Sequence, residues 1–202
     1  MKTAPPAPIG PAGALRLTLR LACLLCWLLS CLLLYLVCSP LPGTNPAARL
    51  FLTGTLRIIG GQLTVTGEPV QAPSILLANH LSWIDILALA AATGSAFVAH
   101  DGLADHPLMR FLCCLNRTVF IARSNRADVS GQVEQVKAGL EGSGVLALFP
   151  EGTTGDGVHI LPFKSSLLSA VEGSEHTVAI RPACVDYPHL NAEIAWTDRE
   201  SG

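Results

Sequence analysis

The stretch SILLANHLSWIDIL, residues 74–87, places the polar pair Asn79 and His80 between two apolar runs. The first run, SILLA, predicts a buried β-strand, and the run that begins with WIDILALAAAT, residues 83–93, predicts a helix. Polar groups between a buried strand and a helix need a reason, because burial without partners is costly. The stretch therefore predicts a strand–loop–helix unit with candidate site residues at the carboxyl end of the strand.

Two interpretations of His80 and Asp85 stay open on these residues alone. Ser82 is a preferred helix N-cap, and Asp85 three residues later suits the N3 position of a capping box. Positions five apart diverge by about 140° on a continuous helix. A histidine in the loop before the cap can instead fold back over the first turn, where Asp85 projects. The carboxylate would then fix the imidazole, whose other nitrogen takes a proton from a substrate hydroxyl.

Apolar runs and helical patterns alternate along the chain after residue 60. The predicted strands are QLTVTG, SILLA, SAFVA, TVFIA, VLALF and TVAIRPACV, and the predicted helices are WIDILALAAAT, HPLMRFLCCL, DVSGQVEQVKAGLEG and KSSLLSAVEG. The strands are apolar on both faces, which is typical of a parallel sheet covered by helices. We expect an α/β domain with a largely parallel sheet flanked by helices, and active groups at the carboxyl ends of its strands.

Further polar groups follow two other predicted strands. In LFPEGTTGDG, residues 148–157, Glu151 lies next to hydroxyls and glycine N–H groups. In NRTVFIARSNR, residues 116–126, Arg123 emerges from a strand end near Arg126, and two cations there suit a phosphate or a carboxylate. Ordinary turn chemistry and solvated surface arginines are the alternative interpretations.

The N-terminal part has the composition of a membrane segment. No residue from Leu21 to Ala48 is charged, and residues 21–38, LACLLCWLLSCLLLYLVC, reach the lower limit of length for a spanning helix. A secretory signal peptide is the competing interpretation, but the run is long for one and no A-x-A-like site closes it. A spanning helix with its basic end in the cytoplasm would leave the rest of the chain outside. A helix that returns through the following proline-rich bend would leave the domain on the cytoplasmic side.

These patterns divide the chain into three parts. We expect a disordered lead over residues 1–14, a membrane-anchoring helical segment over residues 15–59 and the α/β domain over residues 60–202.

Composition and cysteine usage exclude several classes of protein. The 202 residues are 50% hydrophobic and 14% charged, with a formal net charge of −2, which argues against a nucleic-acid-binding protein. The seven cysteines are odd in number and four lie in the apolar segment, so they form no disulfide framework. Cys23 and Cys26 have CxxC spacing, but we expect them to pack between helices. We expect no metal in the site.

The motifs in combination resemble those of the glycerolipid acyltransferases typified by 1-acylglycerol-3-phosphate acyltransferase. NHLSWID, residues 79–85, looks like the N-H-x-S-x-x-D block of that family, and VFIAR, residues 119–123, resembles its second block. FPEGT, residues 149–153, matches the third block, and AIRPACV, residues 179–185, resembles the fourth. The resemblance implies an α/β fold with an N-terminal membrane-embedded helical motif.

The resemblance also implies roles for individual residues. His80 would be the general base and Asp85 its orienting partner. Acceptor binding is implied for Arg123, Glu151, Gly152 and Thr153, with supporting positions at Asn79, Ser82 and Pro182.

The chain departs from the family pattern at four positions. The glycine and the aspartate of the second block are Arg117 and Ala122, an arginine that usually follows the third block is Thr154, and a frequent lysine is His100. The last two changes remove cations that would hold a phosphomonoester. The acceptor therefore need not be lysophosphatidate, and the chain looks more like the bacterial branch that acylates lyso-ornithine lipid.

The expected reaction is transfer of a fatty acyl group from an acyl thioester to the free hydroxyl of a lysophospholipid of the 1-acylglycerol-3-phosphate type. Lyso-ornithine lipid is the alternative acceptor. We expect acyl-CoA or acyl carrier protein as co-substrate, no bound cofactor, no nucleic-acid partner, and a place in the bacterial inner membrane with the domain on the cytoplasmic side. A thioester hydrolase and a non-catalytic lipid-binding protein stay open, the latter because relatives usually continue beyond the point where this chain stops.

Overall fold

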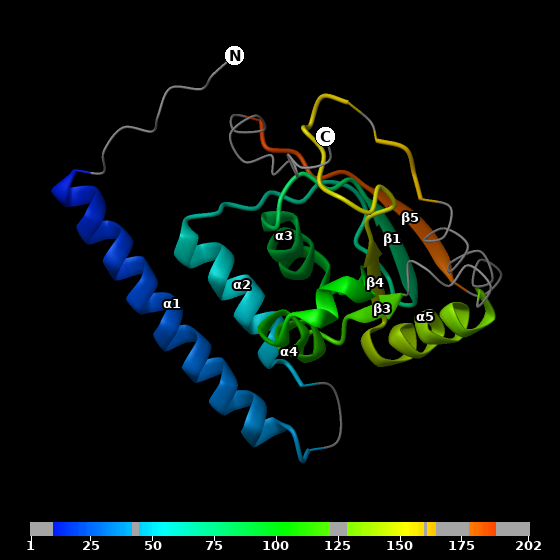
Figure 1. The fold of residues 1–202 in the computed structure, drawn as a ribbon, viewed down its shortest axis with the longest axis horizontal. Helices are drawn as coiled ribbons and strands as arrows, with labels where there is room; N and C mark the ends of the chain where they lie inside the picture. Colours follow the sequence, from blue (N-terminus) through cyan, green and yellow to red (C-terminus); the bar gives the residue numbers. More distant parts are fainter. Residues whose placement is uncertain (1–9, 42–44, 122–128, 160, 165–177, 189–202) are drawn as a thin grey trace. The chain divides into compact units, whose positions relative to one another are not determined.

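A computed structural model of the chain describes residues 10–41, 45–121, 129–159, 161–164 and 178–188. Contacts between residues divide the chain into two compact units, residues 1–62 and 63–202. Figure 1 shows the helices and strands of both units and labels most of them.

The first unit contains two helices, α1 (Pro11–Cys38) and α2 (Ala47–Ile59). α1 begins at Pro11, so residues 11–14 are helical and the predicted disordered lead over residues 1–14 was too long. Proline suits the first position of a helix because its missing N–H has no partner there anyway. α1 is long and apolar enough to cross a membrane. Most of its leucine side chains are exposed.

α1 and α2 pack as a hairpin. The indole Nε1–H of Trp27 on α1 donates to the carbonyl of Phe51 on α2 at 3.2 Å. A Cβ atom on Gly54 of α2 would overlap the same indole, so the absence of a side chain there permits the close approach. Asn45 in the connection donates to the Tyr35 carbonyl at 3.0 Å and accepts the N–H of Ala47 at 3.1 Å. Its side chain therefore joins the end of α1 to the start of α2.

The second unit is built on a five-stranded sheet in which every pairing is parallel. The strands are β1 (Ser74–Ala78), β2 (Ala96–His100), β3 (Val119–Ile121), β4 (Val145–Leu148) and β5 (Ala179–Ala183), in the spatial order β3-β2-β4-β1-β5. This arrangement confirms the predicted α/β fold with a parallel sheet.

One predicted strand was wrong. QLTVTG, residues 62–67, forms no strand, and its Leu63 and Val65 are exposed. The alternation of the segment suits a half-buried strand, but residues 62–67 pair with no strand in the described part of the chain, and all six are exposed.

Helices follow the strands in the predicted order. They are α3 (Ile84–Thr93), the short 3₁₀ helix η1 (Asp101–Asp105), α4 (Pro107–Leu115) and α5 (Val129–Ser143). The predicted helix KSSLLSAVEG, residues 164–173, lies almost entirely outside the described residues. Residues 100–106 contain two histidines and two aspartates, but among the described residues no group of three or more His, Cys, Asp or Glu is placed to hold a metal ion.

The core lies between α5 and one face of the sheet (Figure 1). Val136 and Leu140 of α5 are buried together with apolar residues of the strands, namely Ile75, Ala96, Val98, Ile121, Leu146 and Leu148. A Cβ atom on Gly139 would overlap a methyl group of Val119, so α5 can approach β3 only because residue 139 is glycine.

Strand order decides which loops meet. β1 lies between β4 and β5, with Leu77 opposite both Leu148 and Pro182. Because the strands are parallel, the segments that follow β1, β4 and β5 emerge side by side at one edge of the sheet. The residues after Ala78, Leu148 and Ala183 are therefore brought together, although they are far apart in the sequence.

Candidate active site

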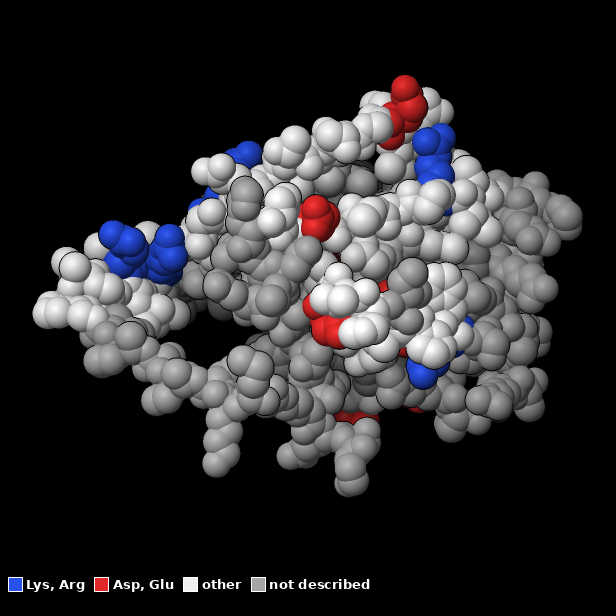
Figure 2. Space-filling view, turned by 90° about the horizontal axis from the view of Figure 1, so that it is seen from above, with Lys and Arg blue, Asp and Glu red and all other residues white. Residues whose placement is uncertain are grey.

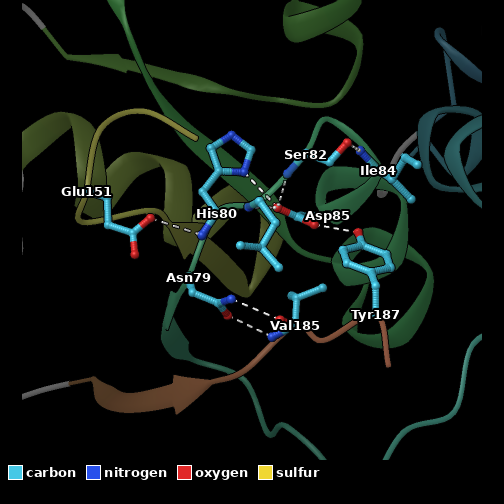
Figure 3. A network of polar contacts seen from close by, with 9 residues as sticks. Asn79, His80, Ser82, Ile84, Asp85, Glu151, Val185 and Tyr187 are labelled. Atoms are coloured by element: carbon cyan, nitrogen blue, oxygen red, sulfur yellow. Dashed lines mark hydrogen bonds and ion pairs between the residues drawn. The ribbon is translucent and has the colours of Figure 1, made fainter. Parts of the chain in front are cut away.

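Asp85 lies at the centre of a polar network at the carboxyl end of β1 (Figure 3). Its side chain is fully buried, and Oδ2 lies 2.9 Å from Nδ1 of His80. The same oxygen accepts the N–H groups of Leu81 at 2.6 Å and Ser82 at 2.9 Å. A buried carboxylate is stable only with such donors around it, so the loop between β1 and α3 holds Asp85 in place.

The start of α3 differs by one residue from the prediction. The helix begins at Ile84 with Trp83 as N-cap, which makes no side-chain cap bond, and the hydroxyl of Ser82 is 3.5 Å from the N–H of Ile84. Asp85 and Ile86 instead donate N–H bonds three residues back, to the carbonyls of Ser82 and Trp83. This tight first turn explains why Ser82 is not the N-cap. The carboxylate half of the capping box is present, because Asp85 accepts the Ser82 N–H.

Nδ1 of His80 is engaged by Asp85, and no described residue hydrogen-bonds to Nε2. An ionised carboxylate can only accept a hydrogen bond, so the contact with Asp85 assigns a proton to Nδ1 of His80. In the neutral imidazole, the free lone pair is then on Nε2. The ring stacks on Phe149, with centroids 3.9 Å apart and planes 15° apart, and its side chain is 17% exposed. The ring is therefore held on one edge and one face, and Nε2 can serve as a base.

Glu151, after β4, adjoins the same loop. The residue is 7% exposed, and Oε2 accepts the backbone N–H of His80 at 3.2 Å. Burial raises the pKa of Glu151, and the neighbouring N–H and imidazole of His80 oppose part of that rise. Gly152 follows with φ of 68°, a left-handed conformation that favours glycine, and its N–H donates to the Phe149 carbonyl at 3.1 Å. Thr153 is half-buried in the same turn.

The rest of this loop also contacts the segment after β1. The N–H of Gly155 donates to the carbonyl of His80 at 2.7 Å. Asp156 accepts the N–H groups of Val158 and His159 and pairs with the His159 ring at 2.8 Å. The hydrogen bonds from His159 and Val158 hold the pKa of Asp156 well below its ordinary value. This second His–Asp pair is exposed, unlike that of His80.

Asn79 ties the end of β1 to the segment after β5. Its side-chain amide donates to the carbonyl of Val185 at 2.9 Å, and its Oδ1 accepts the N–H of Val185 at 2.7 Å. Pro182 lies on the edge strand β5, where its missing N–H is tolerated.

Sequence reasoning missed two contributors to the site. One is Phe149, the platform for the imidazole. The other is Tyr187, whose hydroxyl donates to Oδ1 of Asp85 (Figure 3). Phe149 could have been found from the sequence, because it opens the third block, FPEGT, two residues before Glu151. Tyr187 is 102 positions from Asp85, and only the pairing of β1 with β5 brings the two together.

Arg123 lies outside the described residues. β3, the strand before it, is at the edge of the sheet and is separated from β1 by β2 and β4. On the face in Figure 2, the described residues present few and scattered charged side chains. All seven cysteines are free.

The fold and the network define an α/β protein with a buried His–Asp pair at the carboxyl edge of a parallel sheet. The profile of the acyltransferase family matches residues 62–188, which include the whole of this site. The chain belongs to the acyltransferase family.

Two relatives and one solved structure show the extent of the similarity. The lyso-ornithine lipid O-acyltransferase of Brucella abortus (strain 2308) is 32% identical over 141 residues, which are 67% of this chain and 53% of the relative. The 1-acyl-sn-glycerol-3-phosphate acyltransferase of Neisseria gonorrhoeae is 33% identical over 107 residues, which are 52% of this chain and 42% of the relative. The chain thus spans about half the length of the curated relatives it matches.

The crystal structure of the 1-acyl-sn-glycerophosphate (LPA) acyltransferase PlsC from Thermotoga maritima has the same fold. The TM-score is 0.50, the sequence identity is 22%, and the match covers 84% of this chain and 83% of the other. It supports the observed architecture of the sheet and helices.

Proposed function

We propose that this protein transfers a fatty acyl group from an acyl thioester to the hydroxyl of a lysolipid, with His80 as the general base. The observation that carries the proposal is the contact of 2.9 Å between His80 Nδ1 and the buried carboxylate of Asp85, in a chain of the acyltransferase family. This contact leaves Nε2 as the basic nitrogen.

The chemistry follows from that nitrogen. Nε2 takes the proton of the lysolipid hydroxyl while the oxygen attacks the thioester carbonyl and forms the new ester bond. The carbon–sulfur bond breaks, and the thiol leaves with the proton that the imidazolium returns. Asp85 stabilises the imidazolium between the two steps. General-base assistance of this kind contributes about 10² to 10⁴ in rate.

Glu151, Gly152 and Thr153 are proposed to bind the acceptor, together with Arg123. The support for Glu151 is its place beside His80, where its Oε2 accepts the backbone N–H of the base. The buried carboxylate can accept a hydroxyl or an ammonium of the acceptor headgroup. No metal or bound cofactor takes part in this scheme, and the acyl thioester is a co-substrate carried by coenzyme A or acyl carrier protein.

Lyso-ornithine lipid is the acceptor we favour. The relative from Brucella abortus carries that activity in its name. In this chain, Thr154 and His100 replace an arginine and a lysine of the family pattern that would help to bind a phosphate. Lysophosphatidate is the second candidate, supported by the name of the relative from Neisseria gonorrhoeae.

A panel experiment tests the reaction and the acceptor together. Purified protein is given a labelled acyl-CoA or acyl carrier protein thioester with lyso-ornithine lipid, lysophosphatidate or no acceptor, and products are identified by mass spectrometry. We expect diacylated ornithine lipid as the main product, with thiol release that depends on the acceptor. Thiol release without acceptor would identify a hydrolase. Binding of lysolipid with no product from any acceptor would identify a lipid-binding protein.

We further propose that the second unit lies on the cytoplasmic side of the bacterial inner membrane. Acyl-CoA and acyl carrier protein are cytoplasmic molecules, and an α1–α2 hairpin that dips into one leaflet without crossing the bilayer would return the chain to the side from which it entered. Protease treatment of inverted membrane vesicles should degrade residues 63–202, and treatment of intact spheroplasts should not. The opposite pattern would place the domain outside.

A further inference from the structure

The two oxygens of the Asp85 carboxylate serve different partners. Oδ2 contacts the imidazole of His80 and accepts two backbone N–H groups, whereas Oδ1 accepts the hydroxyl of Tyr187. Figure 3 shows the tyrosine on the opposite side of the carboxylate from the histidine. The network is therefore a chain of three side chains, Tyr187–Asp85–His80.

The placement of Tyr187 is built into the sheet. β5 pairs with β1 up to Ala78 and Ala183, and the two hydrogen bonds between Asn79 and Val185 continue that registration past the ends of the strands. Tyr187 comes two residues after Val185, so the two hydrogen bonds between Asn79 and Val185 place its hydroxyl next to Asp85. A surface tyrosine without such an anchor would lose much side-chain entropy on making this contact.

We propose that Tyr187 is a positioning residue of the active site, which holds the Asp85 carboxylate and moderates the negative charge that it directs at His80. The proposal rests on the proposed function of His80 as general base. Tyr187 acts through Asp85 and takes no proton from the substrate.

The electrostatic consequence has a definite sign. Among the described residues, the titratable side chains that face Asp85 are His80, Glu151 and Tyr187. A hydroxyl donor spreads the charge of the carboxylate, so its removal exposes His80 to a stronger field that favours the imidazolium. Burial, and next the contact with Asp85, raise the pKa of Tyr187 far above its ordinary value, so the hydroxyl stays protonated and remains a donor at physiological pH.

Tyr187→Phe removes the donor and keeps the ring. We expect kcat to fall by about tenfold, which corresponds to about 1.4 kcal/mol in the barrier, with KM for the acceptor nearly unchanged. The acidic limb of the pH profile of kcat/KM should move to higher pH, because the base is protonated over a wider range. Tyr35→Phe is the matched control, since Tyr35 on α1 is the other tyrosine of the chain, and it should retain both kcat and the pH profile.

A shape-preserving change gives the opposite sign. In the Tyr35→Phe background, replacement of tyrosine by 3-fluorotyrosine alters Tyr187 alone, and the more acidic phenol is a stronger donor. The acidic limb should then move to lower pH. This variant also separates the hydrogen bond from any loss of folding in Tyr187→Phe, because the phenol ring and its hydroxyl are kept and only one ring hydrogen is replaced by fluorine.

The titration of the His80 ring by NMR provides a readout that does not need activity. The His80 signal is assigned by its absence in His80→Gln, and Tyr187→Phe should shift its midpoint upward. An unchanged midpoint and an unchanged pH profile would overturn the positioning role, even if His80→Ala abolishes transfer and the proposed function stands. If wild-type protein transfers no acyl group, the proposed function fails, and the midpoint still decides whether Tyr187 moderates the pair.

Discussion

At the scale of single residues, the carboxylate of Asp85 has two roles: it holds the loop before α3, and it is the partner of the His80 ring. Two backbone N–H groups, the His80 ring and the Tyr187 hydroxyl all meet on it. The two interpretations of this residue, helix start and partner of a base, are compatible in the structure. The N–H bonds that shape the first turn of α3 also place the carboxylate beneath the imidazole.

Asp85→Asn should lower both the stability of the fold and the rate of acyl transfer. An amide offers one acceptor oxygen, and its NH₂ group would face donors that have nowhere else to bond. We expect the free energy of unfolding to fall by about 2 to 4 kcal/mol, measured by chemical denaturation. Acyl transfer should fall by at least about 10²-fold, because the ring loses the partner that fixes its tautomer. A variant with wild-type turnover would contradict the assigned role.

Glu151→Gln should stabilise the protein at neutral pH. Burial raises the pKa of Glu151 from its ordinary value of 4.5, so its contribution to stability is full below that value and is lost as pH rises through the higher folded pKa. Glutamine cannot ionise, yet it keeps an oxygen for the His80 N–H. We therefore expect a higher Tm than wild type at pH 7, and a difference that vanishes by about pH 4.

The matched control for this change is Glu134→Gln on α5. Glu134 is exposed and pairs with Lys137 at the surface, so the Tm of Glu134→Gln should stay at the wild-type value. A Tm of Glu151→Gln equal to or below that of the wild type at pH 7 would show that the buried charge of Glu151 does not destabilise the folded protein. Lower activity of the stabilised variant would support the proposed acceptor-binding role.

At the scale of elements, the sequence allowed the pieces to be predicted better than their arrangement. Continuous apolar runs predicted β1 to β5, because strands buried on both faces are apolar throughout. The helical patterns between these runs predicted α3 to α5. The insertion of β4 between β2 and β1 has no local signal, since it depends on contacts between residues distant in the chain. That insertion brings Phe149 and Glu151 next to His80.

Two glycines of α5 should respond in opposite ways to alanine. Gly139→Ala places a methyl group against Val119, and overpacking of this kind costs about 1 to 3 kcal/mol, which exceeds the helix-propensity gain of about 1 kcal/mol. Gly142→Ala meets nothing within 4 Å, so the propensity gain should appear as added stability. Chemical denaturation should show a lower free energy of unfolding for the first variant and a higher one for the second. The same sign for both would contradict the close contact of α5 with β3.

At the scale of the whole molecule, the polar network around Asp85 and an apolar helix belong to one chain whose proposed acceptor is a membrane lipid. A helix long and apolar enough to cross a membrane could be predicted from the uncharged stretch at residues 21–48, because length and composition are local properties of the sequence. The hairpin contacts through Asn45 and Gly54 could not, because they depend on how α1 and α2 pack. The same limit applied in the site, where the His80–Asp85 pair had a local pattern and Tyr187 had none.

Charges in α1 should release the protein from membranes. Leu25 and Leu29 are exposed apolar residues of α1, and each lysine placed in a membrane-embedded helix costs about 2.5 to 3.5 kcal/mol. We expect the double variant Leu25→Lys, Leu29→Lys to move to the soluble fraction after alkaline extraction. The matched variant Leu25→Ile, Leu29→Ile should stay with the membrane. Equal retention of the two would contradict insertion of α1.

The central claim is that His80 is the base, and one comparison tests it most directly. His80→Ala and His159→Ala each remove the ring from a His–Asp pair, but the first pair is buried at the end of β1 and the second is exposed, with side-chain exposures of 17% and 78% for the two histidines. Acyl transfer to lysolipid by the purified, folded variants is measured under identical conditions. The account predicts a loss of at least about 10²-fold for His80→Ala and near wild-type turnover for His159→Ala. Wild-type turnover of folded His80→Ala would contradict it.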